Sequence, residues 1–294
     1  MPAKSRHKGI GALLMCAAMF GGSSIDVAVK ALSGDYSTAQ IVFLRGLIAI
    51  PLVIMLVQYQ VGIRELTRLP LRWQLWRGLL TAGANFGFFY GLKFVPLVTA
   101  LMLAYVSPVL IILLAKPLLG EKIGIGRLIG VLIGFSGVGF VIQPDSLEIH
   151  PAILAILGSA FCWALLSVNN RQLADIASAP VLTFYTYPVS FLIGAFFCWD
   201  VFIMPEGWDW LLFGIVALGS TITHWLVAVA YRYAQAGVIA PFEYTALVWL
   251  TLASYLIWHE LPAVTVWVGG MAVILGGYIA LRSKTEQINT GNGG

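Results

Sequence analysis

The stretch Leu97–Leu119, LVTALMLAYVSPVLIILLAKPLL, contains a single charged residue, Lys116. A membrane-spanning α-helix needs about 20 predominantly apolar residues, because each residue adds about 1.5 Å and the hydrocarbon core is about 30 Å thick. Long unbroken apolar runs also favour helices over the strands of a membrane barrel, in which apolar and polar residues alternate. The stretch therefore predicts a transmembrane helix.

Runs of the same kind fill most of the chain. They fall at 9–31, 38–59, 73–94, 97–119, 125–142, 151–171, 180–203, 210–232, 238–258 and 264–282. Of all 294 residues, 60% are hydrophobic and 10% are charged, whereas a soluble domain has about 45–50% and about 25%. A soluble domain of this size could not bury so much apolar side chain. The sequence therefore predicts an all-α polytopic membrane protein with ten transmembrane helices.

This composition excludes several classes of protein. Short loops and small tails leave no room for a soluble catalytic or nucleic-acid-binding domain, and the basic residues behind the net charge of +4 are scattered. The three cysteines lie within apolar runs, which predicts packing residues rather than a disulfide framework: Cys16, Cys162 and Cys198. The run at 9–31 lacks a clear cleavage site, so we interpret it as the first span and not as a signal peptide.

The loop charges predict the orientation. The side that begins with the N-terminus carries Lys4, Arg6, Lys8, Arg64, Arg68, Arg72, Lys122, Arg127, Arg171, Arg232, Arg282 and Lys284. The opposite side carries Asp35, Lys93, Asp145, Glu148, Asp200, Glu206, Asp209 and Glu260. By the positive-inside rule both termini are cytoplasmic, which agrees with an even number of spans in the inner membrane.

The second half of the chain repeats the first. A shift of 139 residues aligns Tyr105 with Tyr244, Glu121 with Glu260, Gly130 with Gly269 and Gly137 with Gly276, and in the first span a shift of about 143 aligns Phe20 with Trp163. Each repeat has five spans, so the two halves enter the membrane in opposite directions. Inverted repeats are common in secondary transporters, whose sites lie near the midplane. We predict repeats at 1–142 and 150–282 and a cytoplasmic tail at 283–294.

With these features the chain resembles the drug/metabolite transporter superfamily, EamA branch. The matching stretches are Phe20-Gly21 and Trp163-Ala164, Phe43-Leu44-Arg45, Pro117-Leu118-Leu119-Gly120-Glu121 and Trp258-His259-Glu260. Asp26–Leu32 also looks like the corresponding segment of members that move bulky metabolites. The resemblance implies transport of a small organic molecule. Members are similar in fold and differ in cargo, which includes amino acids, vitamins, nucleotide-like metabolites and cations.

We therefore expect a secondary transporter that moves a small organic metabolite by alternating access. An intramembrane enzyme would need a nucleophile with a base, paired carboxylates or a metal cluster, and a channel would need a filter loop. Neither pattern occurs, so we expect no catalytic residue, metal or cofactor. The expected partners are a small-molecule substrate and the lipid bilayer, with no nucleic acid. Proton coupling, direction of transport and the choice between monomer and homodimer stay open.

Two ionisable residues in neighbouring spans lie at matching depth. Asp26 is about 7 Å and Arg45 about 10 Å from the outer ends of their helices, at about 1.5 Å per residue. An ion pair would lower the cost of placing both charges in the membrane. The pair is either a static contact or one that a charged substrate or a proton partly replaces. Asp26 could instead pair with Lys30, one helical turn away.

Six further residues are predicted to bind substrate. Near the midplane, the repeat matches Asn85 with His224 and Phe20 with Trp163; the alternative is that they only pack or form hydrogen bonds between helices. His224 could also carry a proton. Tyr105 and Tyr244 lie about a third of the way in from opposite sides and are candidate gate residues.

Other residues inside the spans have less specific interpretations. Glu243 lies near the cytoplasmic end of 238–258, at the depth of Asn169 and Asn170, and is either a proton or amine site or an interfacial carboxylate. Arg77 is expected to extend to the cytoplasmic face. Two glycine stripes predict close helix packing or a dimer face: Gly83, Gly87 and Gly91; and Gly126, Gly130, Gly134 and Gly137. The prolines expected to bend helices are Pro51, Pro108, Pro188 and Pro241.

Overall fold

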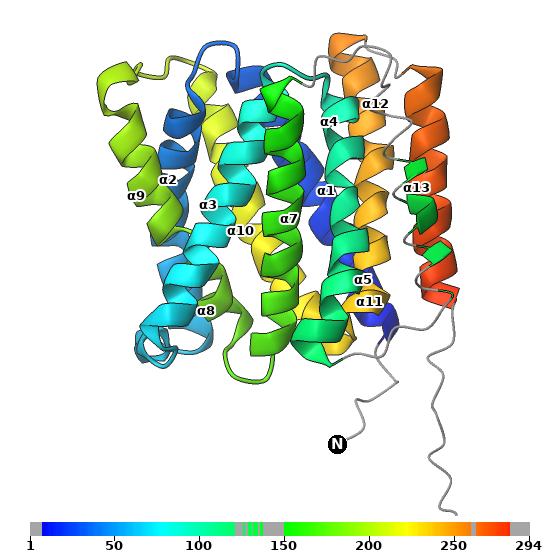
Figure 1. Cartoon of the computed structure of the whole chain (residues 1–294). Coiled ribbons are helices and arrows are strands. Elements are labelled where there is room, and N and C mark those ends of the chain that lie inside the picture. The colour runs from blue at the N-terminus through cyan, green and yellow to red at the C-terminus, as the bar shows by residue number, and fades with distance from the viewer. Residues whose placement is uncertain are drawn as a thin grey trace, which may run out of the picture.

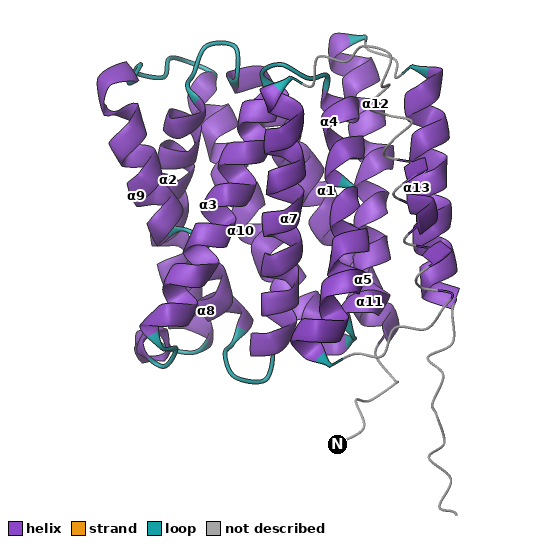
Figure 2. Ribbon diagram, in the orientation of Figure 1, coloured by secondary structure: helices purple, strands orange, loops and turns teal. Residues whose placement is uncertain are grey.

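The computed structural model describes residues 8–120, 126, 129–130, 132–134, 136–137, 150–259 and 263–282. Within these ranges every regular element is a helix, and the long helices run side by side in one bundle (Figures 1 and 2). The first half forms α1 (Lys8–Leu32), α2 (Thr38–Gln60), η2 (Ile63–Thr67), α3 (Leu71–Leu92), α4 (Leu97–Ala104) and α5 (Val106–Leu119). The second half forms α7 (Pro151–Leu173), α8 (Ala179–Phe184), α9 (Pro188–Cys198), η3 (Trp199–Val201), α10 (Asp209–Tyr233), α11 (Ala236–Ile239), η4 (Ala240–Thr245), α12 (Ala246–Trp258) and α13 (Val264–Arg282).

Six segments of the described chain are long and apolar enough to cross a membrane. They are Gly9–Leu32, Thr38–Gln60, Leu97–Leu119, Pro151–Leu173, Ala179–Val201 and Asp209–Tyr233. The chain is therefore a multi-pass, all-helical membrane protein, as predicted. The helices α3, α12 and α13 lie in the same bundle (Figure 1), but they are not among the six. Glu121 and Glu260 lie outside the described residues.

Three of the predicted spans are interrupted, one near its middle and two near their first residues. Tyr105 separates α4 from α5, a short non-helical segment separates α8 from α9, and η4 replaces α-helix between α11 and α12. Proline has no backbone N–H and cannot complete a helical hydrogen bond. Pro108, Pro188 and Pro241 lie at or beside these three breaks, in agreement with the predicted bends, whereas α2 continues through Pro51.

Glycines allow the helices of the two halves to approach closely. On α3, a Cβ at Gly83 would lie 2.7 Å from Sγ of Cys162 on α7, and a Cβ at Gly87 would lie 2.5 Å from the carbonyl oxygen of Ala155. On α10, a Cβ at Gly219 would lie 2.9 Å from Cγ1 of Ile25 on α1. The first glycine stripe is thus a close interface within the chain, as predicted. α1 packs mainly on α10, α3 on α7, and α2 on α9.

The second glycine stripe lies among the described residues between α5 and α7. A Cβ added at Gly276 of α13 would overlap the carbonyl oxygen of Gly130 and lie 2.7 Å from the backbone nitrogen of Gly134. These positions also form a close helix contact inside one chain. All three cysteines are free, which agrees with the packing role predicted for them.

Replacing Gly87 by alanine should lower the stability of the protein by about 1–3 kcal/mol, because the added methyl meets backbone that cannot rotate away. Gly158→Ala on α7 is the matched control, since nothing lies within 4 Å of a Cβ there. The control should be neutral or slightly stabilising, because alanine favours helix more than glycine does. Thermal unfolding in detergent measures both, and equal midpoints for the two variants would contradict the proposed close contact.

Candidate functional site

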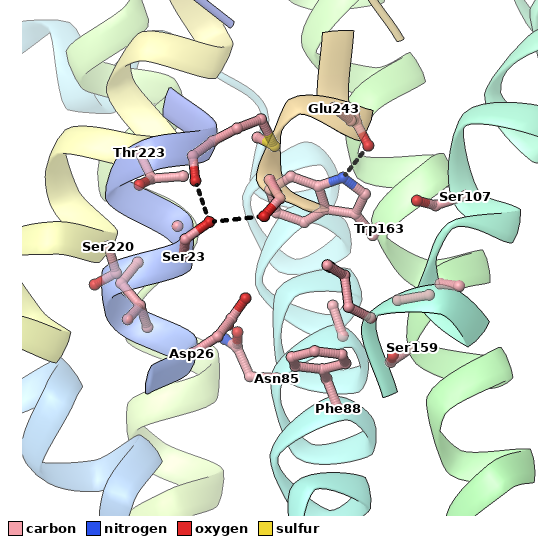
Figure 3. Close-up of a pocket in the computed structure, with 18 of the residues that line it drawn as sticks. Ser23, Asp26, Asn85, Phe88, Ser107, Ser159, Trp163, Ser220, Thr223 and Glu243 are labelled. Atoms are coloured by element: carbon pink, nitrogen blue, oxygen red, sulfur yellow. Dashed lines mark hydrogen bonds between the residues drawn. The ribbon is translucent and has the colours of Figure 1, made fainter. Parts of the chain in front are cut away.

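A cavity of about 170 Å³ lies inside the bundle, with walls from both halves of the chain (Figure 3). The first half contributes four residues of the predicted site, and the second half contributes three. They are Asp26 of α1, Arg45 of α2, Asn85 of α3, Tyr105 between α4 and α5, Trp163 of α7, His224 of α10 and Glu243 of η4. The structure therefore brings together most of the residues that the sequence singled out. Phe88, Phe89 and Leu101 add apolar wall.

Arg45 and His224 form a buried contact in this wall. Nη2 of Arg45 lies 3.0 Å from Nε2 of His224, and the two residues are only 2% and 8% exposed. Since a guanidinium can only donate, Nε2 of His224 accepts and the imidazole is neutral in this arrangement. The guanidinium also lies over the ring of Tyr187, with Cζ 5.2 Å from the ring centroid. Nε of Arg45 has no hydrogen-bond partner among the described residues.

The predicted ion pair between Asp26 and Arg45 is not formed. Both side chains line the cavity, but the only salt bridge in the described part of the chain joins Arg68 and Glu65 at a surface turn. The reason is that Arg45 is directed to two residues of the second half, His224 of α10 and Tyr187 in the break between α8 and α9.

Lys30, the alternative partner considered for Asp26, binds backbone instead. Its Nζ donates to the carbonyl oxygen of Leu92 at 2.7 Å and to that of Val95 at 3.2 Å. Leu92 is the last residue of α3 and Val95 lies in the connection to α4. The last backbone oxygens of a helix lack internal partners and favour a cation. Lys30 therefore stabilises the end of α3.

Trp163 and Glu243 form a second polar contact in the cavity. Nε1 of Trp163 donates to Oε2 of Glu243 at 3.1 Å (Figure 3), and the hydroxyl of Tyr231 donates to Oε1 at 3.4 Å. Glu243 is 4% exposed, so the interpretation as an interfacial carboxylate is wrong. The break at η4 allows this carboxyl to lie inside the bundle, where local donors compensate its burial.

Tyr105 and Tyr244 contact each other. Their ring centroids are 5.1 Å apart at an interplanar angle of 87°, and the Tyr105 hydroxyl donates to the carbonyl oxygen of Tyr244 at 3.2 Å. The two residues therefore meet inside the bundle, and their role as gate residues about a third of the way in from opposite sides stays a prediction. The helices are interrupted at both residues. Tyr105 lines the cavity, whereas Tyr244 lies behind it.

Phe20 does not belong to the site. It is 55% exposed on the outside of the bundle, and its ring packs edge-on against Trp249 with centroids 5.0 Å apart. The position of Phe20 along its span predicts its depth in the membrane, but depth does not determine which face of a helix a residue occupies. Of the four residues matched by the repeat near the midplane, Asn85, His224 and Trp163 line the cavity.

The family follows from the comparison with known proteins. Residues 9–143 and 150–282 each match the model of the EamA-like transporter family. The chain belongs to this family. A solved crystal structure, with 20% sequence identity to this chain, has the same fold at a TM-score of 0.71, covering 92% of this chain and 96% of that one.

Several relatives of this EamA-family chain carry functional names. The pseudopaline exporter CntI of Pseudomonas aeruginosa is 28% identical over 277 residues, which cover 93% of this chain and 96% of the relative. An S-adenosylmethionine uptake transporter of Rickettsia felis is 26% identical over 287 residues, 97% and 96% of the two chains. A riboflavin transporter of Rhizobium johnstonii is 28% identical over 198 residues, 67% and 66%.

Some cavity residues of the EamA-family chain were missed from the sequence. Ser220 and Thr223 precede His224 on α10 and line the same cavity, and Tyr187 binds Ser220 through its hydroxyl at 3.1 Å. A signal for the first two was present, because residues three or four apart share one face of a helix. Tyr187 had none, since it lies in the break between α8 and α9.

Arg77 is buried, and the expectation that it extends to the cytoplasmic face is wrong. It is 1% exposed and donates to Oδ1 of Asn169 at 2.8 Å and to Oδ1 of Asn170 at 3.0 Å. Its Nε and Nη2 also donate to the carbonyl oxygen of Leu182, at 3.2 and 2.9 Å. Neutral acceptors on α7 and α8 therefore satisfy a guanidinium on α3, and Arg77 joins the two halves of the EamA-family chain.

Replacing Arg77 by glutamine should destabilise the EamA-family chain by about 1–3 kcal/mol, because the shorter side chain leaves buried oxygens of Asn169, Asn170 and Leu182 without a donor. Arg232→Gln is the control, since Arg232 is exposed at the end of α10. The measurement is thermal unfolding of the purified proteins. If Arg77→Gln unfolds at the temperature of the parent protein, the buried hydrogen bonds make no measurable contribution.

Proposed function

We propose that this chain is a secondary transporter that moves a small amphipathic organic metabolite across the cytoplasmic membrane by alternating access. The observation that supports this most directly is the cavity shared by the two halves, in which Nε of Arg45 and Nδ2 of Asn85 have no partner among the described residues. Ligand sites combine apolar walls with a few such polar groups. Membership of the family and the names of the relatives support the same class of cargo.

We further propose ten spans in two inverted repeats, at 1–142 and 150–282, with a tail at 283–294. The interfaces of the bundle support this arrangement. In the proposed repeat, α1 corresponds to α7, the sixth span, and α3 corresponds to α10, the eighth span. Exchanging corresponding helices converts the α1–α10 interface into the α7–α3 interface. The same exchange converts the α2–α9 interface into itself. The helix breaks at Tyr105 and at η4 are matched by the shift of 139 residues.

The orientation with both termini in the cytoplasm is also proposed. The start of α1 and the end of α13 lie at the same end of the bundle (Figure 1), which supports an even number of crossings. The loops at that end include the basic residues Arg64, Arg68 and Arg72 around η2. Basic loops stay on the cytoplasmic side of a membrane. Coupling to protons through Glu243 stays a prediction.

Single cysteines test the topology on a background without Cys16, Cys162 and Cys198. A membrane-impermeant thiol reagent added to intact cells should label Glu206→Cys, because position 206 lies in an exposed loop on the predicted outer side. It should not label Thr67→Cys until the cells are permeabilised. Labelling of position 67 from outside would contradict both the orientation and the inverted repeat.

Trp163→Ala and His224→Ala should each weaken cargo binding about tenfold or more, since each removes a wall group that contacts the ligand. Cargo is first found by a thermal-shift screen of the purified parent against metabolites, because a bound ligand raises the unfolding temperature. Binding and counterflow in proteoliposomes then compare the variants, and acceleration by cargo on the opposite side distinguishes a carrier from a pore.

Phe20→Ala is the matched control for these two variants, because it removes an aromatic ring of similar depth from the outside of the bundle. It should bind and transport like the parent. Expression and membrane insertion of all three variants should stay near normal. If Trp163→Ala and His224→Ala bound cargo as tightly as Phe20→Ala, the cavity would not be the cargo site.

A further inference from the structure

The cavity contains both positive and negative groups, and the protein does not pair them with one another. Arg45, Asp26 and Glu243 all line it, yet the one salt bridge found in the described ranges is on the surface, between Arg68 and Glu65. An uncompensated charge in a low-dielectric interior costs several kcal/mol. Groups of both signs held in one cavity without internal ion pairs are therefore suited to a ligand that brings the opposite charges with it.

Among the charged groups of the cavity, Arg45 has the features of an anion-binding residue. Its neighbours His224 and Tyr187 are an imidazole acceptor and an aromatic face, and neither provides a negative charge. Its Nε and Nδ2 of Asn85 are buried donors without partners in the described chain, and both residues line the cavity. A guanidinium and an amide N–H are the donors that proteins use to bind carboxylates.

On the negative side, the two carboxyl groups differ. Glu243 already accepts hydrogen bonds from Trp163 and Tyr231. Asp26 accepts none from the residues that the structure describes, and it lines the same cavity (Figure 3). A carboxylate only accepts hydrogen bonds, so a ligand group that binds Asp26 has to be a donor. A cationic donor forms the strongest hydrogen bond with a carboxylate.

Asp26 and Arg45 also lie at similar depth, six residues before the end of α1 and seven after the start of α2. A ligand in the cavity that carries groups of opposite sign can therefore meet both side chains, because both line it. Trp163 and Phe88 provide ring faces on the same cavity, and aromatic faces suit the apolar or planar remainder of a ligand.

We infer that the cargo is a zwitterion, with its anionic group on Arg45 and Asn85, its cationic group on Asp26, and its apolar body against Trp163 and Phe88. This inference rests on the proposed function, because it assigns a cargo class to the same cavity. It differs from a site for a simple cation, which needs only the carboxyl groups, and from a site for a simple anion, which needs only Arg45 and Asn85.

Matched sets of probes test the charge requirement on the unmodified protein. Each set consists of an amino acid, its carboxamide and its deaminated acid, built on tryptophan, phenylalanine, methionine and glutamate side chains. The carboxamide keeps the cationic group alone and the deaminated acid keeps the anionic group alone. In the sets that bind, the zwitterion should bind at least about tenfold more tightly than either analogue, measured by thermal shift and by counterflow.

Two variants then assign the charges to residues. Asp26→Asn should weaken binding of the zwitterion about tenfold or more and leave binding of the deaminated acid unchanged. Arg45→Gln should weaken binding of the zwitterion and leave binding of the carboxamide unchanged. Asp35→Asn and Arg64→Gln are matched controls at exposed positions and should behave like the parent.

The outcomes separate the inference from the function on which it rests. If a carboxamide, a deaminated acid or a singly charged metabolite binds as tightly as any zwitterion, the inference is overturned and the transporter proposal stands. The inference is also overturned if Asp26→Asn weakens binding of the zwitterion and of the deaminated acid equally, because Asp26 would then affect the structure of the site and not recognise a cationic group. If no probe or screened metabolite binds the cavity at all, the proposed function itself fails. The probe sets need no variant, so a misfolded Arg45→Gln leaves the test intact.

Discussion

Inside a bilayer every backbone N–H and C=O has to find its partner within the protein, because lipid offers none. This constraint explains where the helices of this chain are broken. The breaks at Tyr105, before Pro188 and at η4 all lie against other helices, and the freed groups bind side chains: the carbonyl of Tyr244 accepts from Tyr105, and that of Leu182 accepts from Arg77. Two of the breaks also supply polar residues to the cavity, Tyr105 and Glu243.

Most of the fold was predictable because hydrophobic length determines spans and prolines mark their breaks. The candidate site was predictable in part. Asn85, Trp163 and His224 were found because the repeat and a rise of about 1.5 Å per residue give depth. Phe20 and the Asp26–Arg45 pair failed because neither rule gives the direction of a side chain around its helix. Arg77 failed for a related reason: its acceptors come from α7 and α8, which are remote in sequence.

The polar groups of the cavity fall into two kinds. Trp163 and Glu243 satisfy each other, and Tyr187 and Ser220 form a similar closed contact. Such contacts hold the walls in place without a ligand. Arg45, Asn85 and Asp26 are left incomplete, at similar levels of the membrane, and they are the groups from which a ligand would gain most. Selectivity in a low-dielectric site comes largely from the cost of leaving such groups unmatched.

The glycine contacts constrain how such a molecule can move. Each of the closest seams in the bundle, α1 on α10, α3 on α7 and α2 on α9, joins one helix from each half of the chain. Helices of the two halves therefore alternate in the bundle. The halves cannot separate as two rigid bodies without opening all three of these tightly packed interfaces. The natural mobile units are the cross-half pairs themselves, which can tilt or slide past one another while each seam stays closed. The two repeats of the sequence are thus not the two groups of helices that would move relative to each other.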